Sequence, residues 1–190
     1  MEAVQPVPII SKSLSIDTAL GILTFVVSIE GNDVSSENII LKTFPIKPNL
    51  PTGMNVRNCN AILIQLSKSN KPFGLTYSAV LESNLNGTTC TGEHLDAIEW
   101  EDSQSILVVG TEDGEALKSR MPWWNNDTIE SSASYETSFL RINHAKALHP
   151  KEISVHFIIA ENPTPEPEEC SSWFAVDCEH SKIVAYAKST

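Results

Sequence analysis

Two cysteines and two histidines have the side chains that a structural zinc site requires. Cys90 is followed four residues later by His94, and Cys178 is followed two residues later by His180. Thiolate sulfur and imidazole nitrogen are common ligands in structural zinc sites. The spacing matches no common zinc motif, and ordinary buried thiols with surface histidines explain it more simply. We therefore predict no bound metal and no other cofactor, with these four residues as the candidates if a metal is present.

The most unusual local sequence contains two adjacent tryptophans and reads Trp123-Trp124-Asn125-Asn126-Asp127. In an extended segment, neighbouring side chains point to opposite sides, so at least one indole ring would be exposed. An exposed ring beside amides and a carboxylate can stack on a sugar or form the centre of a protein interface. The alternative is that the segment folds back and one tryptophan closes the end of the core.

The acidic residues are concentrated in two stretches. The chain has 24 acidic and 13 basic residues, a net charge of −11, and residues 92–130 and 161–180 together hold most of the acids. Within the first stretch we predict that Glu112, Asp113 and Glu115 form an acidic surface. Such a surface could bind a basic partner or a divalent cation, or it could keep strand edges from pairing. The charge argues against binding to nucleic acids or to an anionic membrane.

No recognised catalytic motif is present. The chain lacks G-x-S-x-G, the phosphate-binding glycine-rich loop and H-E-x-x-H. Cys178, Glu179 and His180 are contiguous, but adjacent residues of a strand point to opposite faces and cannot form a triad. His156 alternates with the apolar residues of segment 153–159, so we predict that it faces solvent. We therefore name no catalytic residue and favour a protein that is not an enzyme.

The elements that position these residues are predicted to be β-strands. Valine, isoleucine and threonine make up 43 of the 190 residues, and these residue types favour strands. Apolar and polar residues alternate in segments 23–30, 62–66, 75–81 and 153–159. Shorter strands are expected at 39–44, 106–109, 138–142, 173–176 and 183–186. The pattern predicts one all-β domain, residues 1–190: a single antiparallel β-sandwich of nine or ten strands with little helix, of jelly-roll, immunoglobulin-like or barrel type.

Two segments interrupt the alternation. Residues 111–135 show no regular period and predict a long loop that carries the tryptophan pair. Residues 161–170 are rich in proline and glutamate and predict an extended connector between two strands.

The leading hypothesis is a non-enzymatic binding or assembly module that contacts a protein partner, or a second copy of itself, through the tryptophan loop and the acidic surface. A carbohydrate-binding module that uses the same loop is the alternative, and a metal-dependent enzyme is a further one. The first residues lack the features of a signal peptide, and the longest apolar stretch is too short to span a bilayer. Four cysteines are ordinary usage, so we expect a cytoplasmic protein with reduced thiols.

Overall fold

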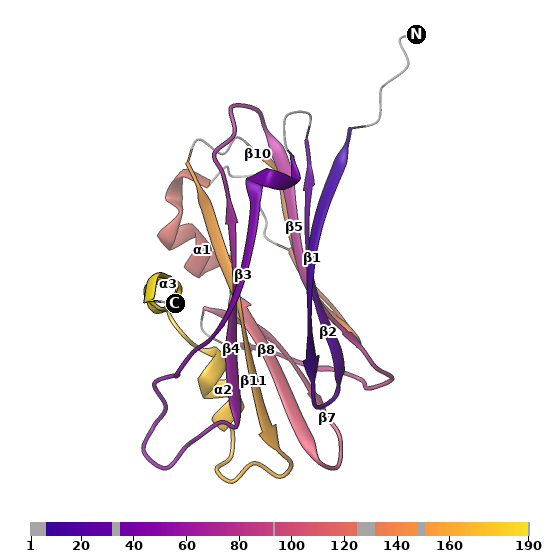
Figure 1. Cartoon of the computed structure of the whole chain (residues 1–190), viewed down its shortest axis with the longest axis vertical. Helices are drawn as coiled ribbons and strands as arrows, with labels where there is room; N and C mark the ends of the chain where they lie inside the picture. The colour runs from indigo at the N-terminus through magenta and orange to yellow at the C-terminus, as the bar shows by residue number, and fades with distance from the viewer. Residues whose placement is uncertain (1–6, 32–34, 93, 125–131, 148–150, 190) are drawn as a thin grey trace.

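Two antiparallel β-sheets packed face to face make up the body of the molecule (Figure 1). The computed structural model describes residues 7–31, 35–92, 94–124, 132–147 and 151–189. In the first sheet the strand order is β1-β2-β5-β10-β9, and in the second it is β3-β4-β11-β8-β7-β6. This architecture confirms the predicted all-β sandwich, with eleven strands in the described part of the chain.

The strands of the first sheet are β1 (Ile9–Thr18), β2 (Gly21–Glu30), β5 (Phe73–Glu82), β9 (Ser132–Glu136) and β10 (Phe139–Ala147). Those of the second are β3 (Ile39–Pro45), β4 (Asn58–Leu66), β6 (Thr88–Gly92), β7 (Leu95–Glu101), β8 (Ser105–Glu112) and β11 (Ile153–Pro163). The helices are η1 (Ser36–Asn38), α1 (Gly114–Arg120), η2 (Pro122–Trp124), α2 (Ser171–Val176) and α3 (His180–Ser189). None of the helices in these ranges is long and apolar enough to cross a membrane.

The main core lies between the two sheets and follows the alternation of the sequence. On β2 the side chains of Leu23, Phe25 and Val27 point inward and are fully buried. Phe25 meets Phe157 of β11 across the core, with ring centroids 5.3 Å apart. The inward side chains of β2 and β11 therefore confirm the pattern that predicted these strands.

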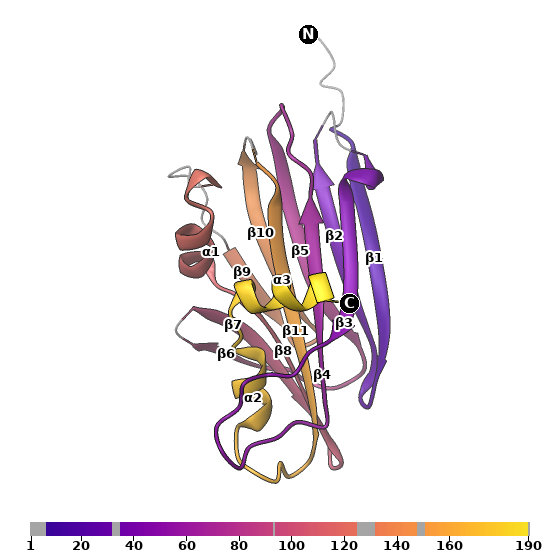
Figure 2. The same ribbon diagram turned by 60° about the vertical axis from the view of Figure 1, so that its left-hand side comes forward.

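A second apolar core lies on the outer face of the second sheet, where α2 and α3 cover the strands (Figure 2). Leu63, Val108 and Ile158 point outward from the sheet and are buried beneath these helices. Gly110 permits the close approach of α2, because a Cβ atom at this position would lie 2.9 Å from Cβ of Val176. The molecule thus has a helical layer outside the sandwich.

The strands predicted at 173–176 and 183–186 are wrong, because these residues form parts of α2 and α3. Alternation over four residues does not separate a strand from one turn of an amphipathic helix. The predicted exposure of His156 is also wrong, since its side chain is 1% exposed. It points to the face opposite the main core, as the alternation requires, but the helical layer covers that face.

The long loop predicted for residues 111–135 is largely replaced by regular structure. Thr111 and Glu112 end β8, and Asp113 then caps α1 by accepting a hydrogen bond at 2.8 Å from the backbone N–H of Ala116. A helix of seven residues is too short to produce a recognisable apolar stripe, which explains why the sequence predicted a loop. Residues 125–131 lie outside the described part of the chain.

The predicted connector 161–170 begins later than expected and leads to a helix. Residues 161–163 belong to β11, and the carboxylate of Glu161 accepts hydrogen bonds from the backbone N–H of Ala19 and the side chain of Asn58. Glu166 accepts hydrogen bonds from the backbone and the hydroxyl of Ser172 in α2. Two acids of the predicted connector therefore form hydrogen bonds that hold the end of the sandwich together.

Candidate metal centre

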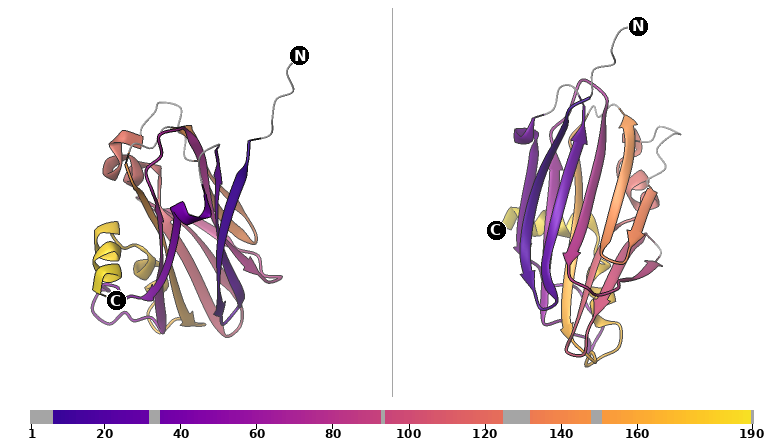
Figure 3. Two further views of the ribbon diagram at one scale, coloured as in Figure 1. Left: turned by 45° about the horizontal axis from the view of Figure 1, so that its top comes forward. Right: turned by 90° about the vertical axis from the view of Figure 1, so that its right-hand side faces the viewer.

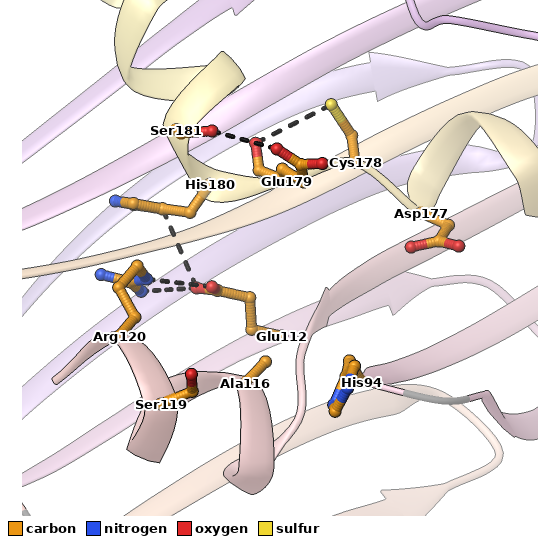
Figure 4. Close-up of a pocket in the computed structure, with 10 residues that line it drawn as sticks. All are labelled: His94, Glu112, Ala116, Ser119, Arg120, Asp177, Cys178, Glu179, His180 and Ser181. Carbon is orange, nitrogen blue, oxygen red and sulfur yellow. Dashed lines mark hydrogen bonds and ion pairs between the residues drawn. The ribbon is translucent and has the colours of Figure 1, made fainter. Parts of the chain in front are cut away.

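A cavity of about 560 Å³ lies where the end of β8 and helix α1 meet the start of α3 (Figure 4). Its walls come from both acidic stretches of the sequence. Glu112 and Arg120 belong to the first stretch, whereas Asp177, Glu179 and His180 belong to the second. The fold therefore brings together two charged segments that are well separated along the chain.

Glu112 is the last residue of β8 and is held by Arg120, the last residue of α1. The Nε atom of Arg120 donates to Oε1 of Glu112 at 3.0 Å, and its Nη2 atom donates to Oε2 at 2.5 Å. Only 12% of the glutamate side chain and 25% of the arginine side chain is exposed. This two-point ion pair fixes the orientation of the carboxylate.

His156 reaches the same carboxylate because of the register between β11 and β8. Ile158 pairs with Gly110, and continuing this antiparallel register by two residues places His156 opposite Glu112. The His156 side chain points toward the helical layer, where burial lowers its pKa and the backbone of Cys178 partly opposes this shift. The strand register and the helical layer together determine the position of the ring.

His180, the first residue of α3, completes the group. Its Nδ1 atom lies 2.8 Å from Nδ1 of His156, and both side chains are buried. Burial, assisted by the nearby Arg120 guanidinium, lowers the pKa of each histidine to about 3. Both rings are therefore uncharged at neutral pH, and one donates its proton to the other.

Three atoms of this group form a triangle of the size that a metal ion requires. Oε2 of Glu112 lies 3.6 Å from Nδ1 of His156 and 3.8 Å from Nδ1 of His180. With the 2.8 Å separation of the two nitrogens, these sides define a circle with a radius of about 2.0 Å. Bonds from zinc to histidine nitrogen and carboxylate oxygen measure about 2.0–2.2 Å. A single point thus lies at bonding distance from all three atoms, and these residues are the metal-ligand group found in the described part of the chain.

The zinc candidates chosen from the sequence lie partly at the same cavity. His94, Cys178 and His180 all line it, but only His180 contributes an atom to the triangle. The Nδ1 atom of His94 is 3.9 Å from Oδ1 of Asp113, and burial raises the pKa of the Cys178 thiol, which makes it a poorer ligand. The side chain of Cys90 lies outside the described part of the chain.

Sequence reasoning missed Glu112 and His156 as ligands. Glu112 was assigned to an exposed acidic group, of which the structure places only Glu115 in an exposed position; Asp113 is half-buried at the N-cap of α1. His156 was assigned to the surface. The available signal was its place directly before the uninterrupted apolar run Phe157–Ala160, because continuous apolar residues are typical of a strand buried on both faces.

The tryptophan segment is described only in part. Trp123 is half-buried and packs against the main core, with Nζ of Lys151 5.0 Å from the centroid of its ring. The side chain of Trp124 and residues Asn125, Asn126 and Asp127 lie outside the described part of the chain. The packing of Trp123 agrees with the alternative in which one ring closes the end of the core.

Comparison of the chain with protein-family models, curated proteins and solved structures finds no match in any of the three. Any function assigned to this chain therefore rests on its own residues.

Proposed function

We propose that this protein binds a divalent transition-metal ion through Glu112, His156 and His180. The observation that carries the proposal is the triangle of Oε2 and two Nδ1 atoms, whose circumscribed radius of about 2.0 Å equals a metal–ligand bond. Two imidazoles and one carboxylate form a ligand set that suits zinc and iron(II).

The protonation and support of the ligands also favour this function. Metal binding requires deprotonated ligands, and both imidazoles are uncharged at neutral pH because their pKa values are lowered to about 3. Histidines that bind metals usually donate their other N–H to a carbonyl or carboxylate, and the backbone of Cys178 lies close enough to the His156 ring to oppose the lowering of its pKa by burial. Arg120 holds the Glu112 carboxylate in the same supporting manner.

Three protein ligands leave coordination positions open, and the adjoining cavity gives them access to a small molecule. Structural zinc sites are closed by four protein ligands, whereas sites that act on a ligand keep one position for water or substrate. The proposed ion would polarise a molecule bound in the cavity, which is the chemistry expected of a metal-dependent enzyme.

Calorimetric titration of EDTA-treated protein with Zn²⁺, and absorption spectroscopy with Co²⁺, test this function. We expect saturation near one equivalent, and a loss of affinity of roughly 100-fold or more in His180→Ala, because even supporting residues of a metal site change affinity about 10–100-fold. His94→Ala and Cys178→Ser are matched controls from the same cavity and should retain binding. Absence of saturable binding, or an equal loss in His94→Ala, would contradict the proposed ligand set.

The binding or assembly role favoured by the sequence stays a prediction, as does its carbohydrate-binding alternative. One feature of the described chain opposes assembly through the free edge of β1. Lys12 lies on the same side of β1 as Leu14 and Ile16, the side that faces the second sheet. Its Nζ atom donates a hydrogen bond to the backbone carbonyl of Ile39. An inward-pointing lysine on an edge strand is a common device that prevents pairing with another strand.

A further inference from the structure

We infer that the open positions of the proposed ion accept a small molecule bearing a carboxylate, and that Arg120 binds the same carboxylate. This inference rests on the proposed function, because it requires an ion held by Glu112, His156 and His180. It assigns Arg120 a role in recognising the ligand, in addition to positioning Glu112.

The guanidinium of Arg120 has one edge in use and one edge available. Glu112 occupies Nε and one N–H of Nη2. Among the described residues, Nη1 makes no hydrogen bond, and Arg120 lines the cavity. The Nη1–Nη2 edge of a guanidinium has two parallel N–H groups, whose spacing matches the two oxygens of a carboxylate.

The available edge lies close enough to the ion for both to bind one anion. Nη2 is 2.5 Å from Oε2 of Glu112, the oxygen that is also a corner of the ligand triangle. With a metal–oxygen bond of about 2.0 Å, the ion would lie no more than about 4.5 Å from Nη2. One metal–oxygen bond and one charge-assisted hydrogen bond together span about 4.9 Å. A single anionic oxygen can therefore contact both groups.

The charges around the cavity favour an anion of low charge. Glu112 and Arg120 neutralise each other, so a divalent ion leaves two positive charges at the site. Asp177 and Glu179 also line the cavity, and Figure 4 shows Asp177 on the other side of Glu112 from Arg120. These carboxylates would repel a polyanion more strongly than a monovalent one. The cavity volume of about 560 Å³ fits a ligand of metabolite size.

Titration of the Co²⁺-loaded protein with acetate, inorganic phosphate and the neutral analogue acetamide tests the inference through the visible absorption of cobalt. We expect a saturable spectral change with acetate, a weaker one with phosphate and none with acetamide. In Arg120→Lys, which retains the charge beside Glu112 but lacks the second donor edge, the acetate affinity measured at saturating Co²⁺ should fall about tenfold. Lys182→Gln, which removes an exposed lysine near the cavity, is the matched control and should bind acetate as the natural protein does.

The outcomes separate this inference from the proposed function. If Co²⁺ does not bind, the metal site itself is wrong. If Co²⁺ binds but acetate produces no saturable change, or the same change in Arg120→Lys, the metal site stands and the role of Arg120 is wrong. Equal binding of acetate and acetamide, or equal binding of acetate to metal-free protein, would likewise overturn the inference. Circular dichroism of Arg120→Lys establishes that a loss does not come from unfolding.

Discussion

The outer faces of the two sheets differ in what covers them. Within the described ranges, no helix lies over the outer face of the first sheet (Figure 3, right), whereas the outer face of the second sheet lies beneath α2 and α3. Strands of the first sheet place serine and threonine outward, and their hydroxyls bond to one another across strands, as Ser11 does with Ser28 at 2.7 Å and Ser15 with Thr24 at 2.9 Å. The hydroxyls of such a face can form hydrogen bonds while it is exposed to water, so the face does not have to be buried.

The outer face of the second sheet is apolar and must be buried. Leu63, Val108 and Ile158 supply the apolar surface, and Ile183 of α3 packs against it. Helix α3, one of the helices that bury this face, also carries His180, and the helical layer buries His156, whereas Glu112 lies at the wall of the cavity. The covering layer therefore creates the candidate site, because it brings remote residues together where burial strengthens polar interactions.

The largest loss of stability should come from shortening a buried side chain on the covered face of the second sheet. Ile158→Ala removes a fully buried side chain and should lower the free energy of unfolding by about 2–5 kcal/mol. The matched change on the open face, Val26→Ala at a half-exposed position, should cost about 1 kcal/mol or less. Urea unfolding of both variants measures the difference. Equal losses would mean that the two faces are equally buried, contrary to the structure.

The second largest loss of stability should come from acid, which acts on the buried His156 and His180. The pKa of His156 and of His180 is about 3 in the folded protein, against an ordinary value of 6.5, so below pH 6.5 the unfolded chain binds protons that the folded chain does not. The contribution of the two histidines to the free energy of unfolding is therefore fully present above pH 6.5. It is lost as the pH falls toward 3, by up to about 1.4 kcal/mol per pH unit for each histidine. Between pH 7 and pH 5 the metal-free protein should lose about 2–4 kcal/mol.

Urea unfolding in EDTA at pH 7, 6 and 5 measures this loss, and His180→Gln should reduce its slope. A stability that stays flat down to pH 5 would show that the histidine pair is solvated. Hydrogen exchange provides a second measurement, since protection should be lost in α3 before it is lost in β2 of the open face.

A smaller loss of stability is expected from a substitution at the contact between α2 and the second sheet. Gly110→Ala places a Cβ atom 2.9 Å from Cβ of Val176 and 3.0 Å from Cδ1 of Leu95, so the helix must shift. Overpacking of this kind costs about 1–3 kcal/mol. A thermal melt followed by circular dichroism measures the change, and an unaltered melting temperature would indicate that α2 is not held closely against β8.

Parts of the fold follow from the sequence with little ambiguity. Segments such as 23–30 alternate strictly because one face is buried and the other is wetted, and this local rule identifies the strand. Helices α1 and α2 have seven and six residues, which is too short for a helical period to emerge, and so they were predicted as loop and strand. His156 was predicted to be exposed because alternation reports only that a side chain points away from the main core. It does not report whether another layer lies there.

An antiparallel β-sandwich could be predicted from the residues of this chain alone, because alternation, β-branched residues and turn signals are local properties of the chain. The meeting of Glu112, Arg120, His156 and His180 is visible only in the folded molecule. Their separations of a few ångströms depend on the register of β8 against β11 and on the packing of two helices against one face. Contacts of this kind join distant segments, and no local pattern of residues encodes them.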